Sequence, residues 1–454
     1  MTSRALALVS LLSLGRSVSA GAAVPNLAET VERFESLRLA PNGSAVTDLT
    51  IEIGHLKLSL KSGSASFVRA GEETVGVFLQ GNGAMQYRSE DWIEFPILVF
   101  NVKKNTSLDL ERVEKNLVIR DRFERALILI AGRPMPEISG SPGSASAEAF
   151  SRHLEKFKRA NFPHLSHLFA QQIVDAPSSP LAVAEIDGGK EALVYTLDGV
   201  QAQSESLRQL HKSDSDDLDL RKLLFPEVLS DQPIGRDRRD PLAPLYFLTD
   251  VDLALTASSG KDAAISVTET VRAQGAKRKI LRFNLYNTSY GEGARTHHLR
   301  SVSDASGNAL AFDHRGDEVA VELKAPLEPE QETKIRFEID GNFLVRPGGD
   351  NFWELGLGGG AWFPQPDLSG QFYTWHSMIR VKKPFIPFSS GQTISRRSEG
   401  DENIVETKTE TPVQFPAVLA GKYEFRQETR EGITIRVATY AMKDERAMKQ
   451  LTDL

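Results

Sequence analysis

The chain has no cysteine among its 454 residues. Disulfide bonds, cysteine nucleophiles and thiolate-bound zinc or iron–sulfur centres are therefore excluded, and a metal ion would need histidine and carboxylate ligands. Positive charge is in slight deficit, because 54 Lys and Arg stand against 61 Asp and Glu and the formal net charge is -7. This balance provides no electrostatic footprint for nucleic acid, so we expect no nucleic-acid partner.

Long uncharged apolar runs are missing after the N-terminus, so we expect no stable membrane span. The first residues, Met1–Ala20, combine Arg4, an apolar run from Ala5 to Leu14, and small residues at Ser19 and Ala20. This pattern is typical of a secretory signal peptide, because the run is about half of the roughly 20 residues that cross a bilayer. The alternative is an apolar N-terminal helix. We therefore expect an exported protein, periplasmic or extracellular.

The motifs of common hydrolases are missing too. No HExxH, which would place two zinc ligands on one helix face, occurs among the nine histidines, and no GxSxG nucleophile elbow is present. His164 and His167 are three residues apart, but no third ligand is evident, so we interpret them as structural or surface residues. Adjacent His297 and His298 would point to opposite faces of a strand and are expected at the surface. The sequence predicts no catalytic residue and no metal site in this chain.

The length and average composition predict two large β domains or about three smaller ones. Period-two alternation predicts many short strands, while helical spacing occurs near 147–174. Residues 108–119 fit a helix, and 126–130 fit a buried strand. The fold class is therefore mainly β, with two β-sandwich-like domains and a helical insertion in the first. The predicted strands are 49–53, 56–60, 74–79, 95–100, 181–186, 192–196, 246–255, 265–271, 279–285, 318–323 and 333–339.

Composition also suggests where the domains end. An N-terminal β-rich domain covers 22–204, and a second β-sandwich covers 242–440. The intervening 205–241 is rich in charge and turn formers, so we interpret it as a linker, with a long surface loop as the alternative. Residues 441–454 return to helix-like composition and would be the start of a truncated following element.

A family resemblance rests on an ordered set of short motifs. Trp362-Phe363-Pro364 is followed by the strand Phe372–Val381, by Pro384 and by Ser390-Gly391. This order resembles the N-terminal β domain of the aminopeptidase N family of zinc metallopeptidases. Residues 413–423 and 432–437 are similar to the exit toward that family's catalytic domain, and the resemblance covers roughly 244–454. It implies a zinc-containing catalytic domain in cis and a peptide substrate, although neither the GxMEN loop nor HExxH is in this chain.

The resemblance also implies a residue that holds the free α-amino group of the substrate, shortly before the Pro turn. Glu354 is the nearby candidate, and an ordinary strand-end glutamate is the alternative. Four aromatic residues are candidates for the interface with a catalytic domain, and their alternative place is the sandwich core. These are Trp353, Trp362, Phe363 and Trp375.

Two functional hypotheses follow. In the first, the chain is the non-catalytic N-terminal portion of an exported aminopeptidase-like zinc metallopeptidase. It shapes the peptide cleft and docks the catalytic domain, with zinc only in that missing domain. In the second, it is a free-standing secreted protein that binds peptide or glycan through exposed aromatic residues. Apolar surface near the C-terminus favours the first, and an isolated aromatic groove favours the second. An enzyme with a scattered site is a third possibility.

Overall fold

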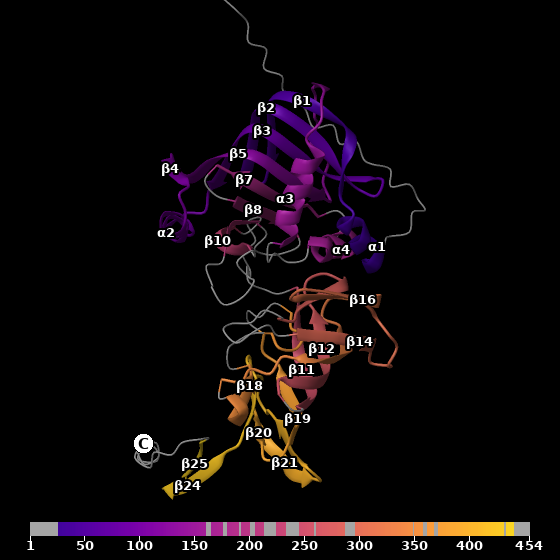
Figure 1. The fold of residues 1–454 in the computed structure, drawn as a ribbon, viewed down its shortest axis with the longest axis vertical. Coiled ribbons are helices and arrows are strands. Elements are labelled where there is room, and N and C mark those ends of the chain that lie inside the picture. Colours follow the sequence, from indigo (N-terminus) through magenta and orange to yellow (C-terminus); the bar gives the residue numbers. More distant parts are fainter. Residues whose placement is uncertain are drawn as a thin grey trace, which may run out of the picture.

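The structure is a computed structural model that describes residues 26–159, 165–175, 179–189, 192–199, 205–212, 224–232, 245–257, 260–286, 296–347, 349–356, 361–366, 371–430 and 433–439. The expected signal peptide and the helix-like 441–454 lie outside the described residues. Figure 1 shows two β-rich units, one above the other along the longest axis. No helix in the described ranges is both long and apolar enough to cross a membrane.

The first unit is built on one ten-stranded antiparallel sheet. The strand order is β10-β9-β8-β7-β5-β3-β2-β1-β6, with β4 paired to β5. Alternating burial along β2 and β5 follows the alternation of apolar residues in the sequence. The strands are β1 (Arg38–Ile53), β2 (Leu56–Ala70), β3 (Glu73–Ser89), β4 (Asp109–Val113), β5 (Asn116–Ala131), β6 (Ser141–Pro142), β7 (Leu181–Gly188), β8 (Ala192–Asp198), β9 (Glu205–Lys212) and β10 (Leu224–Gln232).

Four helices within the described residues flank this sheet. Three of them, α1 (Leu27–Glu35), α3 (Ala147–Arg159) and α4 (Leu165–Asp175), place Phe34, Phe150 and Phe169 in one apolar cluster with the sheet. The fourth, α2 (Phe95–Asn105), places Leu98 and Val102 in a separate cluster with other sheet residues. The predicted helical insertion is thus confirmed as α3 and α4.

Three expectations about this unit are wrong. Residues 95–100 form helix α2 rather than a strand, because Leu98 and Val102, four residues apart, both turn inward and Pro96 suits a helix start. Residues 108–119 form β4 and the start of β5 rather than a helix. The expected linker 205–241 contains β9 and β10, because Leu207, Leu210 and Leu229 are buried against the sheet.

The second unit packs a seven-stranded sheet against two three-stranded sheets. The large sheet has the order β14-β17-β12-β11-β19-β22-β21, and the small sheets are β13-β16-β15 and β18-β23-β20. Only the β11–β19 pairing in the large sheet is parallel among the described strands. One apolar core is shared by the three sheets, which confirms the mainly β, sandwich-like prediction.

Strands of the second unit include the five predicted from period-two alternation, at 246–255, 265–271, 279–285, 318–323 and 333–339. The strands of this unit are β11 (Tyr246–Ala257), β12 (Asp262–Ala273), β13 (Arg278–Asn284), β14 (Thr296–Asp304), β15 (Ala311–Arg315), β16 (Glu318–Leu327), β17 (Glu332–Asn342), β18 (Phe352–Leu355), β19 (Thr374–Lys382), β20 (Ile386–Ser389), β21 (Gln392–Glu399), β22 (Glu402–Lys408) and β23 (Val418–Gly421). A final hairpin pairs β24 (Glu424–Arg430) with β25 (Ile433–Thr439).

Candidate functional site

The aromatic residues selected from the sequence lie in the core of the second unit. Trp353, Trp362, Phe363 and Trp375 are each at most 3% exposed. The rings of Trp362 and Trp375 are 6.0 Å apart, and Trp375 Nε1 donates a hydrogen bond to Ser389 Oγ at 3.1 Å. The core alternative is therefore correct and the interface assignment is wrong, because these side chains have almost no surface left for another domain.

Glu354 lies within the short strand β18. Its backbone N–H donates to the Val345 carbonyl oxygen at 2.8 Å, and Leu419 of β23 is its partner across the strands. The flanking Trp353 and Leu355 are buried, whereas Glu354 is half-buried. Because successive side chains on a strand point to opposite faces, Glu354 points away from the core.

Aromatic side chains share the face on which Glu354 lies. Leu419 pairs with Glu354 on one side and with Phe388 of β20 on the other, so these three side chains stand in one row across the small sheet. Phe352 is two residues from Glu354 and lies on the same face. We call Phe352, Glu354, Phe388, Leu419, Tyr423 and Phe425 the aromatic face. All six are half-buried, and all lie in strands except Tyr423, which directly precedes β24.

The aromatic face combines a carboxylate with π systems. The ring of Tyr423 lies 6.2 Å from that of Phe352 and 5.5 Å from that of Phe388, and the guanidinium carbon of Arg396 lies 4.8 Å from the Phe388 centroid. Carboxylates and aromatic faces both attract cations. The arrangement can therefore receive an ammonium group or an apolar side chain. The sequence motif identified Glu354, but the row that it forms with Phe388 depends on pairing between distant segments.

Among the described residues, no group of three or more His, Cys, Asp or Glu could hold a metal ion. The expected absence of a catalytic group remains a prediction, and His164 lies outside the described residues. His297 and His298 do point to opposite faces of β14, but His297 is buried and stacks on Phe343 with centroids 4.4 Å apart. The surface expectation is wrong for His297, because that face of β14 is covered.

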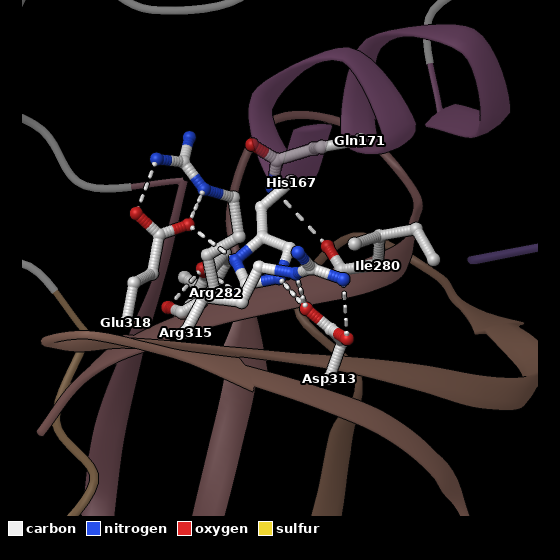
Figure 2. Close-up of polar contacts among 8 residues, drawn as sticks. His167, Gln171, Ile280, Arg282, Asp313, Arg315 and Glu318 are labelled. Atoms are coloured by element: carbon white, nitrogen blue, oxygen red, sulfur yellow. Dashed lines mark hydrogen bonds and ion pairs between the residues drawn. The ribbon is translucent and has the colours of Figure 1, made fainter. Parts of the chain in front are cut away.

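A second polar site joins the two units through His167, which the sequence indicated only as a structural or surface residue; its partners were not predicted. His167 of α4 is fully buried, and its two ring nitrogens face carboxylates of the second unit (Figure 2). Nε2 lies 2.7 Å from Asp313 Oδ2, and Nδ1 lies 3.2 Å from Glu318 Oε1. We call His167, Arg282, Asp313, Arg315 and Glu318 the His167 cluster. Because a carboxylate faces each ring nitrogen, both nitrogens donate when the imidazole is protonated.

Two arginines complete the His167 cluster. Arg282 Nε donates to Glu318 Oε1 at 2.6 Å, and Arg315 Nε donates to Asp313 Oδ2 at 2.6 Å. Burial alone would lower the pKa of His167, but its hydrogen bonds to Asp313 and Glu318 outweigh burial and raise it. For the two carboxyl groups, burial raises the pKa, and the neighbouring charges and hydrogen bonds outweigh it and lower the pKa.

The carboxyl groups of the cluster stay ionised to low pH. Burial would raise the pKa of Asp313, but the hydrogen bonds from His167 and Arg315 lower it to about 2. Burial would likewise raise the pKa of Glu318, but the charge of Arg282 and the hydrogen bond from His167 hold it far below its ordinary range. The cluster is therefore a network of opposite charges in which each ionised group has a partner.

Further contacts surround this joint. Asp175 Oδ1 accepts hydrogen bonds from the backbone N–H groups of Lys279 and Ile280 at 2.8 and 3.2 Å. Burial raises the pKa of Asp175 to about 6. At the start of α1, the backbone N–H of Leu27 donates to Glu322 Oε2 at 2.9 Å. A small apolar cluster adds Leu27, Val31, Ala170, Ile280 and Ala320. Helices α1 and α4 are therefore packed onto the sheet β13-β16-β15.

Comparison with known proteins gives partial matches to solved structures. An M1 zinc metallopeptidase from Deinococcus radiodurans is 17% identical, with a TM-score of 0.35, over 42% of this chain and 46% of that chain. A variant of it bound to a Tyr-Ser-Ala substrate matches at 16% identity with the same TM-score and coverage. The chain thus spans less than half the length of these enzymes. No family model and no curated protein matches the chain.

Proposed function

We propose that this chain is the non-catalytic N-terminal portion of an exported, aminopeptidase-like zinc metallopeptidase. In this role the second unit borders the peptide cleft and docks the catalytic domain, and zinc belongs to that domain. The proposal starts from the motifs Trp362-Phe363-Pro364, Phe372–Val381, Pro384 and Ser390-Gly391. The observation that carries it is the position of Glu354 on the aromatic face, in one row with Phe388.

The chemistry of the aromatic face supports recognition of a peptide N-terminus. A protonated α-amino group needs a carboxylate partner, and the first side chain of a peptide needs an apolar neighbour. Glu354 offers the carboxylate, and Phe352 and Phe388 offer the apolar neighbours. The buried Trp362, Phe363 and Trp375 hold this sheet from behind by filling the core beneath it.

The first experiment is to sequence the encoding DNA beyond the codon for Leu454 and to translate it. We expect an open reading frame with HExxH and a downstream Glu. A stop codon at that point would overturn the assignment as part of a peptidase chain. The free-standing peptide- or glycan-binding protein would then be tested by titrating peptides and oligosaccharides against the aromatic face.

The second experiment tests Glu354 in the complete gene product. Glu354→Ala should raise KM for a peptide with a free amino group by about tenfold to a hundredfold, because a charged hydrogen-bond partner is lost. A substrate with an acetylated N-terminus should not distinguish the two proteins. The matched control is Glu410→Ala, which removes an exposed carboxylate elsewhere in the second unit. An unchanged KM in Glu354→Ala would show that the amino group is held by another residue.

A further inference from the structure

Exposed apolar side chains are concentrated around helix α2. Among the described residues, eight large hydrophobic side chains are exposed, and five of them lie together. Trp92 and Ile93 lie in the turn before α2, and Ile97 and Phe100 lie on the helix. The fifth, Val228 of β10, is adjacent because Asn101 Nδ2 donates to its carbonyl oxygen at 3.3 Å. We call Trp92, Ile93, Ile97, Phe100 and Val228 the α2 patch.

Helix α2 is apolar on opposite sides. Leu98 and Val102 are buried against the sheet, whereas Ile97 and Phe100 are 62% and 59% exposed. Ile97 and Phe100, spaced i and i+3, therefore share one stripe on the outer side of the helix. Single exposed apolar residues are ordinary, but a surface helix normally has a polar outer face. The outer face of α2 is therefore suited to an apolar environment.

Positive charge lies beside the α2 patch at the C-terminal end of the helix. The last turn of the helix contains Lys103 and Lys104, the helix has no acidic residue, and Lys104 Nζ lies 5.1 Å from the centroid of the Phe100 ring. Glu94, just before the helix, accepts hydrogen bonds from Ser89 Oγ and Ser230 Oγ at 3.1 and 2.8 Å. Because both serines are buried, this carboxylate is directed toward the protein interior.

We propose that the α2 patch docks the protein onto an anionic lipid surface. Trp92, Ile97 and Phe100 enter the boundary between headgroups and acyl chains, where tryptophan is favoured. Lys103 and Lys104 contact the anionic headgroups. A stable protein interface takes roughly 20 residues on each side, far more than this patch provides. Figure 1 shows α2 at the edge of the first unit opposite α1, which contacts the second unit.

Tryptophan fluorescence gives a direct test. Of the four tryptophans, Trp353, Trp362 and Trp375 are at most 3% exposed, whereas Trp92 is 73% exposed. We expect vesicles of phosphatidylcholine and phosphatidylglycerol to shift the emission to shorter wavelength, and Trp92→Phe to abolish the shift while the protein still sediments with the vesicles. Phosphatidylcholine vesicles alone should bind more weakly, by about tenfold.

Two double variants test the apolar and the charged parts separately. Ile97→Ser with Phe100→Ser, and Lys103→Glu with Lys104→Glu, should each reduce sedimentation with anionic vesicles by about tenfold or more. The matched control is Phe372→Ser with Ile394→Ser, which removes two exposed apolar side chains of the second unit and should bind like the wild type. Thermal unfolding checks that every variant is folded.

Three outcomes would overturn the proposal. The first is a wild-type protein that binds neither kind of vesicle. The second is equal binding by the Ile97 and Phe100 double variant and the wild type. The third is a wild-type dimer in analytical ultracentrifugation that this variant dissociates, since the α2 patch would then bind a second copy of the chain. None of these outcomes depends on peptidase activity, so the proposal is tested independently of the proposed function.

Discussion

Glu269 of β12 has its carboxylate inside the core of the second unit, where neither oxygen has a hydrogen-bond partner among the described residues. Burial raises its pKa well above the ordinary value. In the pH range between the two pKa values, the folded protein therefore holds one proton more than the unfolded chain. Stability contributed by this residue falls as pH rises through that range.

We expect Glu269→Met to raise the free energy of unfolding by about 1–3 kcal/mol at neutral pH, because a buried polar group is replaced by an apolar one of similar size. The gain should shrink as pH falls toward the ordinary glutamate pKa. Urea unfolding of both proteins across this pH range measures it. Glu269→Gln is the matched control, since it keeps a buried polar group. A Met variant no more stable than the Gln variant would contradict the argument.

His167 is a buried residue of the joint between the units, with a carboxylate of the second unit at each ring nitrogen. His167→Ala should lower the free energy of unfolding by about 2–4 kcal/mol, because it removes a charge that faces two buried or half-buried carboxylates. His298→Ala is the control, since this exposed histidine lies on β14 of the second unit. Chemical denaturation at about pH 6 measures both variants near the ordinary histidine pKa. Equal stability of the two variants would show that the arginines alone hold the carboxylates.

At the scale of elements, β19 is an interior strand between β11 and β22. Trp375→Ala should lower the free energy of unfolding by about 3–5 kcal/mol, because it empties a large volume in the core. Phe372→Ala, at a residue that is 58% exposed just before β19, should change stability little. Thermal and urea unfolding compare the two. A small effect of Trp375→Ala would contradict the conclusion that this side chain fills the core.

Periodicity in the sequence decided which helices and strands could be predicted. Strands with one buried face, such as β12 and β17, alternate clearly and were predicted correctly. The run that became α2 is apolar on both sides, so alternation could not separate a strand from a helix. For β9 and β10 the composition predicts a linker, because charged residues between the two strands dominate this stretch of the sequence. The leucines of these strands are buried because β9 pairs with β8 and β10 pairs with β9, and this pairing is not visible in the local sequence.

At the scale of the whole molecule, the His167 cluster makes the stability of the joint between the two units depend on pH. The pKa of His167 is raised in the folded state, so its contribution is full below the ordinary histidine pKa and is lost as pH rises through the folded value. The pKa values of Asp313 and Glu318 are lowered, so their contributions are full above the ordinary carboxyl values and are lost in strong acid. The joint is therefore most stable in mildly acidic solution.

We expect the stability difference between wild type and His167→Ala to be largest between about pH 4.5 and 6.5 and to decrease at higher pH. Urea unfolding of both proteins over a pH series measures this difference. His314, which also lies near the cluster, has its pKa lowered by burial and stays neutral over more of this range. A difference that is constant up to alkaline pH would show that His167 acts without its charge.

The sequence by itself determined the mainly β class, the helical pair α3 and α4, and Glu354 as the carboxylate to test, because periodicity and short motifs are local properties. Tertiary structure alone decided that Trp362 and Trp375 face the core, that Phe388 stands beside Glu354, and that His167 meets Asp313 and Glu318. These contacts join segments far apart in the chain. They are set by strand register and by the packing of the two units, which local patterns do not encode.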